Sequence, residues 1–159
     1  MNPLIPDLFA QWTAQLGLPE VALDATGMAA LEIEQGIIVN FQAQPSPAVL
    51  TLLAWIGPLP QDWQAALMQD MLEANLLWIA TGGATLSLQR NAQTGMLDAV
   101  VAQSMAVHKG SAVTELQRVF DNLCLVALDW KARLEQPGRW LAPAESGNHA
   151  FPRMPASQA

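Results

Sequence analysis

Residues 31–41 have the sequence LEIEQGIIVNF, in which apolar and polar side chains alternate on either side of Gln35-Gly36. Alternation with a period of two is typical of a β-strand that buries one face, and a Gln-Gly pair between two such runs suits a tight turn. We therefore predict an antiparallel hairpin over this stretch. The side chains predicted to share its buried face are Leu31, Ile33, Ile37, Val39 and Phe41.

Three further strands are predicted on the C-terminal side of this hairpin. Residues 48–56 are apolar at nearly every position, which indicates a strand covered on both faces. Residues 85–89 alternate cleanly, residues 91–95 have turn composition, and residues 96–107 are long and mostly apolar. These features predict a second hairpin, so the sheet is expected to consist of antiparallel strands.

Three helices are predicted around these strands. Residues 3–16 repeat apolar side chains at a helical interval. Residues 62–80 contain no Gly or Pro, so this segment is expected to form about five helical turns that end at Gly82-Gly83. A last helix is predicted from about Ser111 to the residue before Pro137. The predicted fold is α+β, an antiparallel sheet with three helices in the order α-β-β-β-α-β-β-α.

The predicted middle helix carries two apolar stripes rather than one. The first contains Trp63, Leu67, Met71, Ala74 and Trp78, and the second contains Met68, Leu72, Leu76 and Ile79. Two stripes need two partners, of which one can be the sheet of the same chain. A second copy across a two-fold axis is the simplest partner for the other stripe, so we predict a homodimer. Its candidate interface residues are Leu72, Leu76 and Ile79.

The composition argues for a protein-binding surface and against nucleic-acid binding. Hydrophobic residues make up 52% of the chain and charged residues only 13%, so some apolar surface is expected to need covering. The formal net charge is −7, and the seven Lys and Arg residues are scattered along the sequence. Without a basic stripe the protein has nothing to neutralise phosphates, and no nucleic-acid partner is expected.

The chain of 159 residues is expected to form one domain over residues 1–137. Residues 138–159 hold Pro143, Pro152 and Pro155 without any periodicity, which predicts a flexible C-terminal tail. No uncharged apolar run reaches the roughly 18 residues that a membrane span needs. A single cysteine fits a reducing compartment, so we predict a cytoplasmic protein that does not insert into membranes.

The sequence offers no set of residues for catalysis, cofactor binding or metal binding. The only histidines, His108 and His149, are far apart and lack the spacing of metal ligands. Cys124 lies in the middle of the predicted last helix, where a thiol behaves as a small hydrophobic side chain. We therefore expect no enzymatic activity and assign no catalytic, cofactor or metal residues.

Four short segments carry a family resemblance. They are residues 16–19 (LGLP), 56–60 (IGPLP), 72–76 (LEANL) and 82–88 (GGATLSL), and the last two are the most specific. With the small size, the acidity and the predicted order of elements, they resemble the class I chaperones of type III secretion systems, also called the Tir-chaperone family. The resemblance extends over about residues 4–135.

The resemblance implies a small acidic cytoplasmic homodimer that binds the N-terminal segment of a secreted effector in extended form. Such a chaperone keeps the effector soluble and competent for secretion without catalysing a reaction. An extended segment can be held by apolar grooves and by backbone hydrogen bonds at a sheet edge. Our candidate effector-binding residues are Ile5, Phe9 and Ile38, because each is apolar yet lies off the main core stripe of its element.

A different class of protein also fits the sequence. A dimeric α+β module could close the same apolar surface around a small hydrophobic molecule instead of a polypeptide. A polypeptide that copurifies with the protein would support the chaperone hypothesis, whereas a bound lipid-like molecule would support this alternative.

Overall fold

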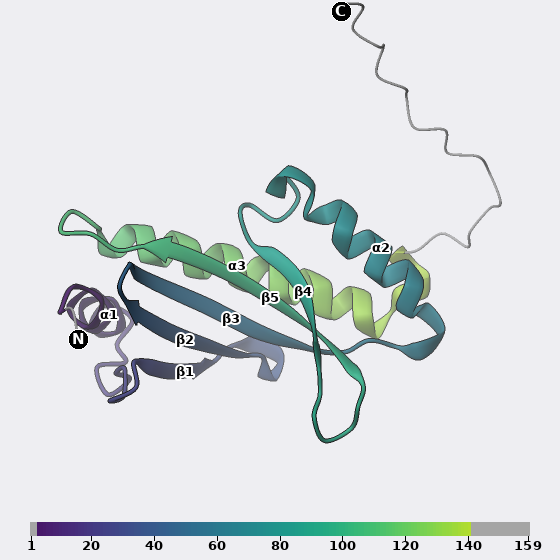
Figure 1. Cartoon of the computed structure of the whole chain (residues 1–159), viewed down its shortest axis with the longest axis horizontal. Coiled ribbons are helices and arrows are strands. Elements are labelled where there is room, and N and C mark those ends of the chain that lie inside the picture. The colour runs from purple at the N-terminus through teal and green to yellow at the C-terminus, as the bar shows by residue number, and fades with distance from the viewer. Residues whose placement is uncertain (1–2, 141–159) are drawn as a thin grey trace, which may run out of the picture.

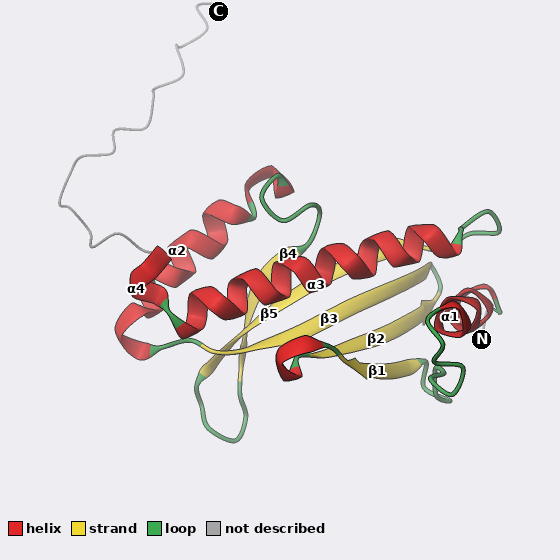
Figure 2. Ribbon diagram, turned by 180° about the vertical axis from the view of Figure 1, so that it is seen from behind, coloured by secondary structure: helices red, strands yellow, loops and turns green. Residues whose placement is uncertain are grey.

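The computed structural model describes residues 3–140 and confirms the predicted order of elements. A five-stranded antiparallel sheet carries α1 and α3 on one face (Figure 1, Figure 2). The main elements are α1 (Leu4–Gln15), β1 (Met28–Glu32), β2 (Ile38–Pro45), β3 (Ala48–Pro58), α2 (Gln64–Ala74), β4 (Thr85–Arg90), β5 (Leu97–Ala106), α3 (Val113–Glu135) and α4 (Pro137–Trp140). Short 3-10 turns are η1 (Glu34–Gly36), η2 (Gln61–Trp63) and η3 (Leu76–Trp78).

The strands lie in the order β1-β2-β3-β5-β4, and every neighbouring pair is antiparallel. The register pairs Leu31 with Val39 and Ala29 with Phe41, so these side chains share one face as the alternation predicts. Gln35 in the turn has a φ of 59°, a left-handed conformation that allows the chain to reverse. The first predicted hairpin is therefore confirmed in both its position and its buried face.

The core lies between this face of the sheet and the helices α1 and α3. An aromatic cluster joins all three, because Trp12 from α1 contacts Phe41 from β2 and Phe120 from α3, with ring centroids 5.4 and 5.0 Å apart. The Trp12 Nε1 donates a hydrogen bond of 2.6 Å to Gln117 Oε1, so the buried indole keeps a polar partner. Figure 2 shows α3 lying across β3 and β5 with α1 beside its N-terminal part.

The opposite face of the sheet is only partly covered, which corrects the prediction for β3. Leu50, Leu52 and Ala54 are fully buried, but the alternate side chains of β3 are partly exposed and Trp55 is 37% exposed. The apolar run of this strand predicted cover on both faces. Within residues 3–140, helices pack on one face only, and we call the opposite one the open face.

The middle helix is shorter than predicted. It ends at Ala74, and residues 76–80 form an exposed loop instead of two further helical turns. The helix stops because the Asn75 side chain bonds to the backbone of Leu86 on β4, which turns the chain away from the helix axis. The sequence predicted that Gly82-Gly83 ends this helix. In the structure the two glycines instead lead into β4, and α2 has already ended at Ala74.

In the C-terminal region the last long helix agrees with the sequence, whereas the first residues of the predicted tail are helical. The last long helix, α3, begins at Val113 and ends at Glu135, within two residues of the prediction. A short helix, α4, follows at 137–140. The predicted flexible tail at 138–159 falls almost entirely outside the described residues. Among the residues that are described, no helix has both the length and the apolar character needed to cross a bilayer.

Candidate functional site

Two of the three predicted effector-binding residues belong to the core. Ile5 and Phe9 on α1 are each only 1% exposed, so the expectation that they lie outside the core is wrong. The apolar surface of α1 is wide because this helix packs against both the sheet and α3. Phe9 stands edge-on to Phe41, with ring centroids 5.0 Å apart. Neither side chain is available to a partner in this structure.

Ile38 is the predicted residue that does reach the surface. It is 48% exposed at the start of β2, and it points to the open face because its neighbour Val39 points into the core. The pairing of Val39 with Ala54 brings Trp55 to the same open face, beside Ile38. Trp55 is in turn paired with Val100 on β5. An apolar row therefore crosses three strands of this face.

The predicted dimer residues are strongly exposed. Leu72, Leu76 and Ile79 are 72%, 71% and 82% exposed in the single chain. The sequence missed that Leu77 and Trp78 join them, since Trp78 had been placed on the other stripe of the predicted helix. We call the five side chains Leu72, Leu76, Leu77, Trp78 and Ile79 the apolar patch. A patch of five large exposed apolar side chains, four of them consecutive in sequence, is typical of a protein-binding surface.

A pocket of about 290 Å³ lies beside the apolar patch, between α2 and the edge strand β4. Most of its lining is apolar, and Leu72 belongs both to the pocket and to the patch. The lining residues are Met68, Met71, Leu72, Asn75, Leu86, Ser87 and Leu88. Flexible Met side chains suit the binding of an apolar side chain of variable shape.

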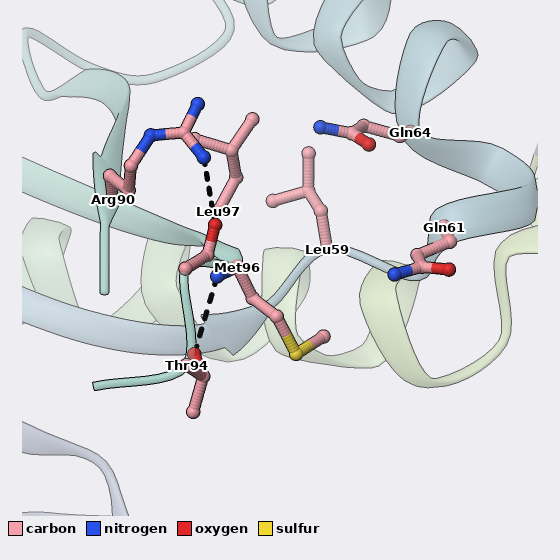
Figure 3. Close-up of a pocket in the computed structure, with 8 residues that line it drawn as sticks. Leu59, Gln61, Gln64, Arg90, Thr94, Met96 and Leu97 are labelled. Atoms are coloured by element: carbon pink, nitrogen blue, oxygen red, sulfur yellow. Dashed lines mark hydrogen bonds between the residues drawn. The ribbon is translucent and has the colours of Figure 1, made fainter. Parts of the chain in front are cut away.

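A second pocket, of about 230 Å³, has a more polar lining and lies between the β4–β5 turn and the start of α2. Gln61 and Gln64 point into it toward Leu59 and Arg90 (Figure 3). The Arg90 Nη1 donates a hydrogen bond of 2.7 Å to the carbonyl oxygen of Gly95, so the guanidinium helps to hold the turn. The Gln61 and Gln64 amides and the Arg90 guanidinium lie at the solvent-exposed rim of this pocket. Its described lining holds no carboxylate, His or Cys that could act as a general acid or base.

Cys124 is the titratable side chain with the largest pKa shift among the described residues. Burial, and to a smaller extent the Asp121 carboxylate, raises the pKa of its thiol from 9.0 to about 11. A thiol with such a pKa is almost entirely protonated at neutral pH and is a poor nucleophile. Within residues 3–140, no three His, Cys, Asp or Glu side chains gather into a group that could hold a metal ion.

This shift predicts slow thiol chemistry. At pH 8 a pKa of about 11 leaves roughly a hundredfold less thiolate than the ordinary value of 9.0, and the greater nucleophilicity of the more basic thiolate offsets about tenfold of this loss. Cys124 of the folded protein should therefore react about tenfold more slowly with a disulfide reagent than Cys124 of the unfolded chain. The absorbance of the coloured thiol that the disulfide reagent releases measures both rates, with the unfolded chain in denaturant as the control. Equal rates in the two states would contradict the assigned burial.

The fold and these surfaces can be compared with those of known proteins. A sequence search against curated proteins gives no match. The solved structure of the HopA1–SchA chaperone–effector complex contains a similar chain, with 18% identity, a TM-score of 0.64, and coverage of 82% of this chain and 95% of the other. The Yersinia pestis type III secretion chaperone SycH in complex with a fragment of YscM2 also contains one, with 19% identity, a TM-score of 0.61, and coverage of 78% and 97%.

At these identities the structural likeness shows the fold alone. YbjN from E. coli, described as a putative transcription regulator, has a similar fold at 16% identity, with a TM-score of 0.56 and coverage of 80% of this chain and 91% of the other. The family model is decisive, because it matches residues 7–123 and thus most of the chain. This match confirms the resemblance found in the sequence, and the chain belongs to the Tir chaperone protein (CesT) family.

Proposed function

We propose that this protein is a cytoplasmic, non-catalytic chaperone that binds the N-terminal segment of a type III secreted effector in extended form. Binding keeps that segment soluble and ready for secretion. The family membership supports the class of function. The open face of the sheet is the observation that carries the binding mode, because it presents Ile38 and Trp55 side by side and partly exposed.

The open face suits an extended apolar segment. Ile38, Trp55 and Val100 form a row across β2, β3 and β5, and only Val100 is already buried. A bound segment can place its own apolar side chains against this row and remove it from water. Strand β1 is an edge of the same sheet, and beyond Met28, whose backbone groups already bond to Asp24, its outward N–H and C=O groups can pair with the backbone of the segment. Backbone pairing tolerates many sequences, as a chaperone for an unfolded segment requires.

The apolar patch supports a homodimer as the working form of the chaperone. Its side chains are 53% to 82% exposed in the single chain, whereas among the other large apolar side chains that the structure describes only Leu125 is more than half exposed. A two-fold axis through the patch would cover each copy with the other. The pocket between α2 and β4 adjoins the patch through Leu72, so it can receive an apolar side chain of the second copy.

Coexpression tests the proposal directly. The tagged protein is produced together with the products of neighbouring genes, and a polypeptide that copurifies is identified by mass spectrometry. Deletions of that polypeptide then locate the bound segment, which is expected near its N-terminus. Failure of every neighbouring product to copurify, or binding of a folded domain in place of an extended segment, would contradict the proposed function.

Replacement of Ile38 by Asp is expected to weaken effector binding selectively. A charge in the middle of a buried apolar contact costs about 2 kcal/mol, which corresponds to an affinity roughly thirtyfold lower. Folding and dimerisation should be retained, since Ile38 is half-exposed and lies on the face opposite to the core. Titration calorimetry measures the affinity and a melting curve measures the fold.

Leu125→Asp is the matched control for this experiment. Leu125 is a similarly exposed apolar residue on α3, on the other side of the sheet, so the same added charge should leave the affinity unchanged. Wild-type affinity for Ile38→Asp would exclude the open face as the binding surface.

The alternative function, binding of a small hydrophobic molecule, is favoured by one feature. The pocket between α2 and β4 is mostly apolar, and its volume of about 290 Å³ lies near the lower limit for ligand sites. Native mass spectrometry of the purified protein distinguishes the two functions, because a bound lipid-like molecule adds a small, defined mass whereas an effector segment adds a polypeptide.

A further inference from the structure

The loop between α2 and β4 has a backbone conformation that its residues disfavour. Leu77 and Trp78 have φ angles of 57° and 53°, in the left-handed region that side chains with a Cβ rarely adopt. Both side chains are exposed, so they gain little from packing that would offset this cost. Contacts outside the loop must therefore hold residues 76–80 in place.

Asn75 holds the N-terminal end of the loop. Its Nδ2 donates a hydrogen bond of 2.8 Å to the Leu86 carbonyl oxygen, and its Oδ1 accepts one of 2.9 Å from the Leu86 N–H. Leu86 lies on the outer edge of the sheet, where a neighbouring strand would otherwise bind these two groups. The amide thus takes the place of a paired residue and fixes the point at which the chain leaves α2. The backbone N–H of Trp78 also donates a hydrogen bond to the backbone carbonyl oxygen of Asn75.

Asn122 on α3 holds the C-terminal end. Its Nδ2 donates hydrogen bonds of 2.9 and 3.3 Å to the carbonyl oxygens of Thr81 and Gly82. The same nitrogen also donates to Gln103 Oε1 on β5 at 2.8 Å, which orients the amide. Because an amide nitrogen carries two hydrogens, two of these three acceptors share one hydrogen. Gly82 fits closely against Asn122, because a Cβ at this position would overlap the Asn122 Oδ1. Two amides from outside the loop therefore fix its two ends.

We propose that Asn75 and Asn122 are positioning residues that preset the apolar loop for association with a second copy of the chain. This inference rests on the proposed homodimer and adds how its surface is shaped. The loop residues Leu76, Leu77, Trp78 and Ile79 form most of the apolar patch. With both ends fixed, these side chains are already arranged in the free chain, and association does not have to order them. Without the amides the loop relaxes to other conformations, and only a fraction of molecules is competent to associate.

The test uses Asn75→Ala and Asn122→Ala in the full chain. Each substitution is expected to raise the dimer dissociation constant at least tenfold, as measured by analytical ultracentrifugation well below the melting temperature. A loss of overall stability alone would leave this constant unchanged among folded molecules. Asn91→Ala is the matched control, because Asn91 also organises a turn through its side chain, at the β4–β5 hairpin away from the loop.

Amide hydrogen exchange supplies an independent measurement. In a Leu76→Asp background, where a second copy cannot protect the loop, Asn75→Ala should speed exchange at Trp78 and Leu86 at least tenfold. Asn122→Ala should do the same at Gly83, whose N–H bonds to Trp78. If the wild type dimerises and both variants keep its dissociation constant, the positioning role is overturned while the dimer stands. A wild-type monomer at micromolar concentration would overturn the proposed dimer and this role with it, whatever the exchange rates.

Discussion

Leu76→Asp should convert the dimer into a folded monomer. Leu76 is 71% exposed in the single chain, so the new carboxylate stays hydrated there and the melting temperature of the monomer should change little. In a two-fold interface the substitution occurs twice, and two desolvated carboxylates cost about 4 kcal/mol, a dissociation constant roughly a thousandfold higher. Sedimentation equilibrium over a range of concentrations measures this change.

Ile38→Asp is the control for the dimer experiment, since it adds the same charge to an exposed apolar residue on a different surface. It should leave the dissociation constant of the dimer unchanged. The two variants thus separate association of the chaperone from binding of the effector. If Leu76→Asp sediments as a wild-type dimer, the interface does not include the apolar patch.

Phe9→Asp is expected to unfold the protein. Phe9 is 1% exposed and its ring packs on both Trp12 and Phe41, so the substitution leaves a cavity and places a charge without a partner in the core. Loss of a core Phe alone costs about 3–5 kcal/mol, and the buried carboxylate adds to it. A small domain is stable by only about 5–15 kcal/mol, so most of the folded population should be lost. Circular dichroism and urea titration measure the effect.

Ala10→Asp is the matched control on the same helix. Ala10 is the next residue along α1 and is exposed, so the added carboxylate remains in water and the free energy of unfolding should change by less than about 1 kcal/mol. Should Phe9→Asp melt like the wild type and lose only the effector, Phe9 would be a binding residue after all.

The sequence predicted most of the fold because its signals are local. The hairpin over residues 31–41 follows from alternation on both sides of a Gln-Gly turn, and the structure pairs Leu31 with Val39 as expected. The α3 helix follows from helical spacing that ends before Pro137. Each of these features depends on residues close together in the chain, where periodicity is informative.

The errors concern contacts between distant segments. No Gly or Pro marks the end of α2, because the cause is a pair of hydrogen bonds from Asn75 to Leu86, eleven residues further along the chain. Similarly, periodicity showed that α1 has a wide apolar face but not that the sheet and α3 cover it, so Ile5 and Phe9 were placed outside the core. Ile38 was placed correctly because a strand alternates strictly between two faces.

Both edges of the sheet are shortened by a residue that lies outside it, and this has a consequence for aggregation. Asn75 occupies both backbone groups of Leu86 on β4, and Asp24 occupies both backbone groups of Met28 at the start of β1. A foreign strand therefore cannot pair along the full length of either edge. Polymers that grow by edge-to-edge pairing need two long, compatible edges on every subunit, and this sheet provides two short ones. Apolar side chains can thus stay exposed on the open face without a matching route to fibre growth.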